Sequence, residues 1–185
     1  RVLYLEGDLR LEQKFLRRSL NDSPDIDIDF QWIDHRRRDQ WPVNLGDTLS
    51  NPKFDVLILG DLDAAALGTQ NLKDIAKAID AGKGFVMLGG FHSFGAGGYE
   101  STPLADVLPV RMDRLLRQDF GAPIVEQLHA RGPLKMTPIV DHPLVRLGSS
   151  SDNAGIWAKL PPLRGANRVV DIKERFRAVA ASGPT

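Results

Sequence analysis

Three short apolar runs constrain the fold of this chain most strongly, because each ends in a polar or glycine-containing turn. The runs are RVLYL (1–5), FDVLIL (54–59) and GFVML (84–88). Runs of this length bounded by turn residues are typical of fully buried strands. Apolar stripes at helical spacing follow the first two runs, over 9–21 and 69–81. Strands that alternate with amphipathic helices predict an α/β fold, a mostly parallel sheet with helices on both faces.

Other segments add detail to this prediction. The apolar face of the first helix is expected to consist of Leu11, Phe15, Leu16 and Leu20. The strict alternation of DIDIDFQW (25–32) predicts a one-sided strand at a sheet edge. Thr102, which precedes Pro103, is placed to cap a short helix. Beyond Pro109, short β-like runs lie among proline-rich connections, with no indication of a second domain.

Composition narrows the classes of function. Lys plus Arg and Asp plus Glu both number 24, so no overall field favours nucleic acid. The longest apolar run is far shorter than the roughly 20 residues that span a bilayer. The chain has no cysteine, which excludes disulfides, thiolate metal sites and cysteine nucleophiles. We expect no cofactor, no metal and no nucleic-acid partner, and membrane attachment only through segments outside this chain.

Polar turns at the strand ends are the clearest functional signal. In an open parallel sheet, ligands bind beyond the carboxyl ends of the strands, near the point where the strand order reverses. The three apolar runs end in carboxylates or glycines, and a parallel sheet would bring these turns to one edge. The candidate ligand-binding residues are Glu6, Arg10, Asp61, Gly89, Gly90, His92 and Ser93.

Two phosphate-binding motifs fail on spacing. Gly90 and Gly95 have the gap of a Walker A loop, but Ala96-Gly97 stands where Lys-Ser/Thr is required. The first strand-to-helix turn, LEGDLRLE (5–12), carries carboxylates where a dinucleotide pyrophosphate needs backbone N–H groups. The glycine-rich loop after the third apolar run, GGFHSFGAGG (89–98), is therefore expected to pass close to the carboxylates of the sheet edge rather than to bind phosphate.

A magnesium site is one alternative use of the strand-end carboxylates. Asp8, Asp61 and Asp63 could bind Mg²⁺ as in a receiver-type phosphoacceptor domain. Such a domain also needs a lysine at the end of a later strand, and none follows Pro109 in that position. The same aspartates could instead accept hydrogen bonds from turn N–H groups.

A hydrolase is the other alternative. Glu6 or Asp61 would act as general base with His92 assisting, which requires a concave pocket and a carboxylate within hydrogen-bond reach. Arg10 could hold an anionic ligand, or it could pair with Glu6 or Asp61 to stabilise the turn.

Three segments resemble a known family: RVLYLEGDLRLEQKFLRRSL (1–20), FDVLILGDLD (54–63) and GKGFVMLGGFHSFGAGGYESTPLADVLPV (82–110). They look like the class I glutamine amidotransferase-like domain of large bacterial membrane proteins of the planctomycete type. HPLVRL (142–147) and IWAKLPPLRGANRV (156–169) fit the same pattern, so the resemblance covers nearly the whole chain.

This resemblance implies a single flavodoxin-like domain over 1–185, part of a longer chain and lacking its C-terminal end. It implies the soluble part of a membrane-anchored bacterial protein, with a periplasmic location as the expectation and a cytoplasmic one as the alternative. True class I amidotransferases use a Cys nucleophile with a His and a Glu, whereas this chain has no Cys and no downstream His-x-Glu. The expectation is a non-catalytic module, with no catalytic residues, that binds a small ligand or a protein partner.

Overall fold

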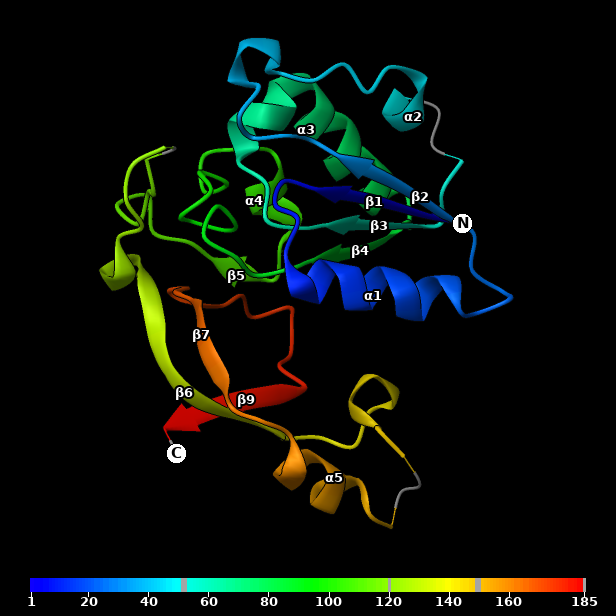
Figure 1. Ribbon diagram of the computed structural model, residues 1–185, viewed down its shortest axis with the longest axis vertical. Helices are drawn as coiled ribbons and strands as arrows, with labels where there is room; N and C mark the ends of the chain where they lie inside the picture. The colour runs from blue at the N-terminus through cyan, green and yellow to red at the C-terminus, as the bar shows by residue number, and fades with distance from the viewer. Residues whose placement is uncertain (51–52, 120, 149–150, 185) are drawn as a thin grey trace.

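A four-stranded parallel sheet forms the centre of the N-terminal half (Figure 1). The computed structural model describes residues 1–50, 53–119, 121–148 and 151–184. The strands are β1 (Val2–Glu6), β2 (Ile28–Trp32), β3 (Val56–Leu59) and β4 (Gly84–Met87). Their spatial order is β2-β1-β3-β4, and every neighbouring pair is parallel. The predicted α/β class with a parallel sheet is confirmed.

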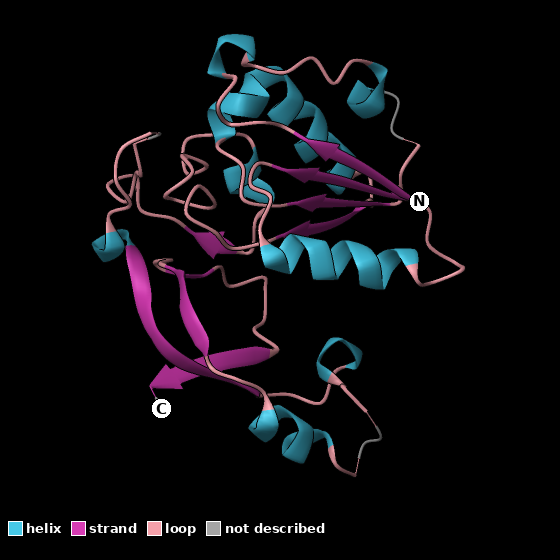
Figure 2. Ribbon diagram, in the orientation of Figure 1, coloured by secondary structure: helices cyan, strands magenta, loops and turns pink. Residues whose placement is uncertain are grey.

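Helices cover both faces of this sheet, as Figure 2 shows. On one face, α1 (Leu11–Asn21) packs through Leu16 and Leu20 against the side chains of Tyr4 and Ile58. On the other face, α3 (Ala64–Asp80) contributes Leu72 and Ile75 to the larger core, which includes Leu5 and Leu59. The short helices α2 (Asp47–Ser50) and α4 (Leu104–Val107) belong to this second side. No helix among the described residues is both long and apolar enough to cross a bilayer.

Of the two edge strands, β2 agrees with the sequence-based expectation and β4 does not. β2 lies at an edge beside β1, as its alternating pattern predicts. β4, expected to be a buried strand, forms the opposite edge, and the side chain of Val86 is 42 % exposed. Among the described strands, β4 pairs only with β3. The apolar run 84–88 therefore forms an edge strand, although its composition is typical of a central one.

The rotation of α1 about its axis also differs from the expectation. Leu11 and Phe15, expected in the core, are 71 % and 66 % exposed, whereas Gln13 is buried. The guanidinium of Arg17 stacks 3.8 Å from the centre of the Phe30 ring. The amphipathic pattern thus predicted the helix and the inward positions of Leu16 and Leu20 correctly, but it was wrong about Leu11 and Phe15.

Helix boundaries on the other side of the sheet also depart from the prediction. α3 spans Ala64–Asp80, and its opening turn, which was not predicted, is capped by the carboxylate of Asp63, which accepts a hydrogen bond from Ala65 N (2.9 Å). Gly68, at φ 69°, interrupts the helix after this turn, so the regular part of α3 begins at Thr69, as predicted. The hydroxyl of Thr102 donates to Tyr99 O (2.8 Å) instead of capping α4.

The C-terminal part forms small antiparallel sheets, and β-like runs were expected in this part of the chain, but their pairing was not predicted. β5 (Val110–Arg111) pairs with β8 (Asp171–Ile172). β6 (His129–Pro138) lies between β7 (Leu163–Asn167) and β9 (Ala180–Pro184). We call residues 129–184 the C-terminal lobe. The short 3₁₀ turns are η1 (Arg38–Gln40), η2 (Glu126–Leu128) and η3 (Pro143–Val145).

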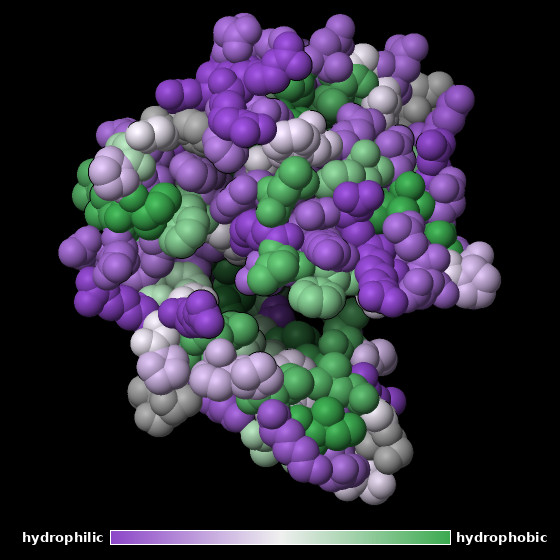
Figure 3. All heavy atoms as spheres, in the orientation of Figure 1, coloured by the Kyte–Doolittle hydropathy of each residue, from purple (hydrophilic) through white to green (hydrophobic). Residues whose placement is uncertain are grey.

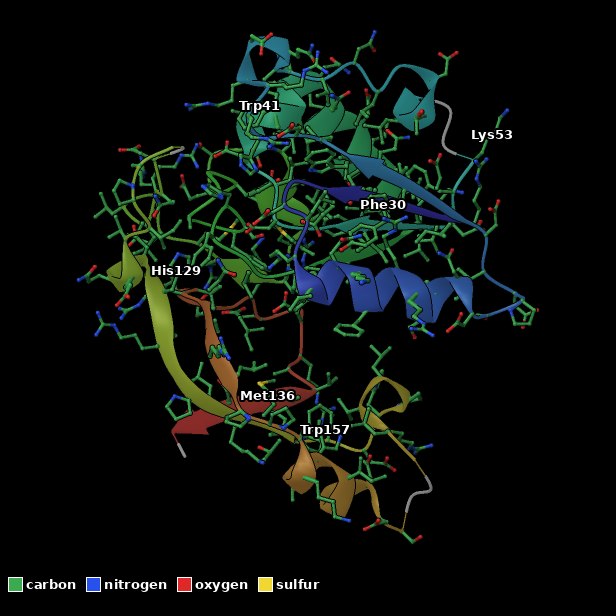
Figure 4. The ribbon with its side chains drawn as sticks, in the orientation of Figure 1. Phe30, Trp41, Lys53, His129, Met136 and Trp157 are labelled. Atoms are coloured by element: carbon green, nitrogen blue, oxygen red, sulfur yellow. The ribbon has the colours of Figure 1, made fainter. Side chains whose placement is uncertain are left out.

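One contact shows how the far end of this lobe is held. Figure 4 labels Trp157 on α5 (Asn153–Lys159), and its indole Nε1 donates to Val145 O of η3 (2.8 Å).

A comparison of the exposed Leu11 on α1 with the buried Leu59 on β3 tests the fold directly. We expect Leu59→Ala to lower the free energy of unfolding by about 2–5 kcal/mol, because Leu59 is fully buried and its loss leaves a cavity. Leu11→Ala, the same change on the outer face of α1, should alter it by less than about 0.5 kcal/mol. Urea denaturation measures both, and a comparable loss at Leu11 would contradict the observed rotation of α1.

Candidate functional site

The ends of all four parallel strands surround one cavity. Their arrowheads point to the same side of the molecule in Figure 1, which brings the four following turns together. The cavity has a volume of about 250 Å³. Its lining comprises Gly7, Asp8, His35, Trp41, Asp61, Leu62, Asp63, Phe91, His92 and Ile124. We call this the strand-end cavity.

The carboxylate of Glu6, at the end of β1, is fully buried and joins the first and third strand ends. Its Oε2 accepts a hydrogen bond from the hydroxyl of Tyr4 (2.6 Å). Its Oε1 accepts from the backbone amides of Asp61 (2.7 Å) and Asp8 (3.2 Å). Burial, with the adjacent Glu6 carboxylate, raises the pKa of Tyr4 well above its ordinary value. A Cβ at Gly60 would overlap the Glu6 carboxylate, so only glycine fits there.

The carboxylate of Asp61 organises the glycine-rich loop after β4. Its Oδ2 accepts from Phe91 N (2.9 Å), and its Oδ1 accepts from His92 N (2.6 Å) and from the hydroxyl of Ser93 (3.3 Å). A Cβ at Gly90 would overlap this carboxylate. The expected close approach of the loop to Asp61 is therefore confirmed.

Asn167, at the end of β7, holds the same loop from the other side. Its amide donates to Gly90 O (2.8 Å) and Ser93 O (3.2 Å), and its carbonyl accepts from Gly90 N (2.9 Å). This side chain therefore links the C-terminal lobe to the parallel sheet. The distance of about 75 residues along the chain hides the contact from local sequence patterns, so sequence reasoning missed it.

Two arginines pair with carboxylates around the cavity. Arg10 Nη1 donates to Gly89 O (3.0 Å), and its Nη2 lies 3.8 Å from Glu6 Oε1. Arg117 Nη2 lies 2.7 Å from Oδ2 of buried Asp63, and its Nη1 donates to Ala96 O (2.8 Å). Of the two roles considered for Arg10, pairing with Glu6 is the one that these contacts support.

Burial weakens two of the histidines at this edge, His92 and His129, as bases. Burial lowers the pKa of His92, against the opposing charges of Asp61 and Asp63. Burial likewise lowers the pKa of His129, which Figure 4 labels on β6 and whose ring meets that of Phe91 edge to face at 5.3 Å. His35 Nδ1 lies 3.3 Å from Gly7 O, a geometry in which the ring donates. The imidazoles of His92 and His129 are therefore mostly neutral near pH 7.

The seven residues predicted from sequence do meet at one edge, but in different roles. Asp61 and His92 line the strand-end cavity, whereas Glu6 and Ser93 are fully buried behind it. Arg10, Gly89 and Gly90 take part in the contacts that shape the loop. Sequence reasoning missed the aromatic and apolar part of the lining: Trp41, Phe91 and Ile124.

The two alternative chemistries find little support in this geometry. Within the described residues, no group of three or more His, Asp or Glu side chains is arranged to hold a metal ion, and Asp8, Asp61 and Asp63 form none. A general base needs a carboxylate lone pair directed at a substrate or water. The oxygens of Glu6 and Asp61 accept hydrogen bonds from the protein itself, including one from the backbone N–H of His92 to Asp61.

No protein family and no curated protein matches this chain. The resemblance to glutamine amidotransferase-like domains therefore stays an expectation.

The hydrogen bonds to Asp61 lead to a stability prediction. In Asp61→Asn one acceptor oxygen becomes an amide NH2 group, a donor that faces a backbone N–H, so we expect a loss of about 1.5–3 kcal/mol of unfolding free energy. Asp25→Asn removes the same charge from an exposed turn at the opposite end of the sheet and should change it by less than about 0.5 kcal/mol. Equal effects in urea denaturation would show that Asp61 does not organise the loop.

The two buried histidines predict a pH dependence of stability. Their pKa values lie below the ordinary 6.5 in the folded state, so the unfolded chain binds more protons as the pH falls below 6.5. Stability from this source is complete above pH 6.5 and is lost as the pH falls through the folded-state pKa values. In His92→Gln/His129→Gln the decline of Tm between pH 7 and 5 should be shallower, whereas His142→Gln on the η3 turn serves as control. An unchanged slope in the double variant would contradict this assignment.

Proposed function

We propose that this chain is a non-catalytic ligand-binding module of flavodoxin-like, class I glutamine amidotransferase-like fold, with its ligand in the strand-end cavity. The observation that carries the proposal is the position of the cavity. In the order β2-β1-β3-β4, the strand order reverses between β1 and β3. Gly7 and Asp8 after β1, and Asp61 and Asp63 after β3, line the cavity on either side of that point. Flavodoxin-like folds bind their ligands at this switch point.

The inventory of reactive groups supports binding rather than catalysis. The chain has no cysteine for the amidotransferase reaction. The carboxylates of Glu6 and Asp61 each accept hydrogen bonds from protein donors. The neutral His92 is half-buried, and the contact it makes with Asp61 runs through its backbone amide.

The charges of the lining indicate the chemistry of the ligand. Glu6 and Asp63 are compensated by Arg10 and Arg117. In the described part of the chain, no ion pair joins Asp8 or Asp61 to a cation. Negative charge thus remains at a cavity that has aromatic walls.

The walls and the size narrow the ligand further. Trp41 and Phe91 are ring systems of the kind that attract cations. The volume of about 250 Å³ is smaller than typical drug-sized sites, so the ligand is small. A small organic amine or guanidinium compound with a short apolar group fits this lining best.

The resemblance extends this proposal to the cellular context. As part of such a family, the module would belong to a membrane-anchored bacterial protein and face the periplasm. Hydrophobic spans of about 20 residues flanking this segment in its full-length reading frame would support that placement, and their absence would remove it.

Isothermal titration calorimetry with small amines, guanidinium compounds, carboxylates and phosphates tests the ligand class. We expect the cations to bind, and Asp8→Asn to weaken them roughly fivefold, about 1 kcal/mol, through the loss of a partly exposed charge. Asp25→Asn, the same change at the other end of the sheet, should leave binding unaltered. Binding of anions alone would overturn the ligand class, and binding of nothing in the panel would count against the module itself.

A further inference from the structure

The outer face of α1 carries an apolar patch that the fold does not use. Leu11 and Phe15 are four residues apart on this helix and mostly exposed, and Leu9 in the preceding turn is exposed as well. Side chains four residues apart in a helix are neighbours on one face. Leu11 and Phe15 are therefore adjacent on the helix surface, and Leu9 lines the same groove as Leu11.

The helix cannot turn this patch into the core, because contacts at both ends set its rotation. Arg10 at its N-terminus is tied to Gly89 O and to the Glu6 carboxylate. Arg17 in the second half stacks on the ring of Phe30. Burying Leu11 and Phe15 against the sheet would break these contacts.

A row of cations runs beside the patch. Lys14 and Arg18 are four residues apart in α1, so each faces a like charge, whereas Arg10, four residues before Lys14, is paired with Glu6. Like charges at this spacing destabilise a helix. Arg18 lies in the last turn, where the helix dipole favours a cation, but Lys14 has no such compensation. Within the described residues, neither Lys14 nor Arg18 forms an ion pair.

The surface next to this helix is concave. A groove of about 590 Å³ runs along α1 and is lined by Leu9, Arg10, Leu11, Gln13, Lys14, Arg17, Arg18, Asn21 and Asp22. Phe15 does not line the groove, and it lies one turn beyond Leu11 on the neighbouring part of the helix face. Figure 3 shows the surface hollowed between α1 and the C-terminal lobe, with hydrophobic residues gathered on the lobe below the hollow. In Figure 1 that lobe projects beyond α1, which would hold a flat bilayer away from the helix.

We propose that the outer face of α1 docks an acidic amphipathic helix of a partner protein. The apolar stripe of such a helix would cover Leu11 and Phe15, and carboxylates at four-residue intervals would pair with Lys14 and Arg18. Helix-in-groove recognition uses this combination of spaced apolar anchors and flanking charges. The charge complementarity selects an acidic partner, and the groove selects a rod-shaped one. This surface is separate from the strand-end cavity and does not depend on its ligand.

The test uses fluorescence anisotropy with a labelled synthetic helix of about 21 residues, with Leu at the heptad core positions and Glu beside them. We expect Lys14→Glu/Arg18→Glu to weaken binding at least about tenfold, and Phe15→Ser to weaken it without any change of charge. Lys73→Glu/Lys77→Glu is the matched control, because it reverses two exposed lysines at the same spacing on α3. An unchanged Tm shows that each variant is folded.

Three results would overturn the proposal. The first is no binding of the peptide to the unaltered chain at concentrations up to about 1 mM, a Kd too weak for a specific interface. The second is an equal loss in the α1 variant and the α3 control, which would show a general charge effect. The third is binding that depends on Lys14 and Arg18 to vesicles of anionic phosphatidylglycerol but not to the peptide, which would identify a membrane surface instead.

Discussion

The carboxylate of Asp61 receives hydrogen bonds from Phe91, His92 and Ser93, and the geometry of the strand-end edge depends on these contacts. They wrap the glycine-rich loop around a charge that is almost completely buried. Gly90 of this loop exchanges hydrogen bonds with the side chain of Asn167 on β7. The contact between the C-terminal lobe and the parallel sheet therefore depends on a loop conformation that Asp61 stabilises. A buried carboxylate is tolerated here because amide and hydroxyl donors replace the water it has lost.

Two further charge pairs explain why so many ionisable groups at this edge have structural roles. Glu6 draws together the turns after β1 and β3, and Arg10 ties Glu6 to the loop. Asp63 caps α3 and pairs with Arg117. The remaining negative charge borders a small aromatic cavity at the point where the strand order reverses. The polar groups that first suggest catalysis therefore shape the walls of the proposed binding site.

The same contacts determine what α1 shows to solvent. Because Arg10 is held at the sheet edge and Arg17 on the ring of Phe30, the helix buries Gln13 and leaves Leu11 and Phe15 outside. The surface opposite the sheet is consequently both apolar and cationic. The two proposed recognition sites are thus separate: the strand-end cavity for a small cation, and the outer face of α1 for an acidic protein segment.

The sequence by itself determined the parallel strands, the helices between them and the edge at which their polar turns meet. These features follow from apolar periodicity and from turn residues, which act over a few neighbouring positions. It also predicted that the glycines bring the loop close to a strand-end carboxylate. Only the tertiary structure decided the buried face of α1, the edge position of β4, the separate antiparallel sheets and the hold of Asn167 on the loop. Each of these depends on contacts between residues far apart in the chain, such as Arg10 with Gly89, and no local pattern of side chains encodes them.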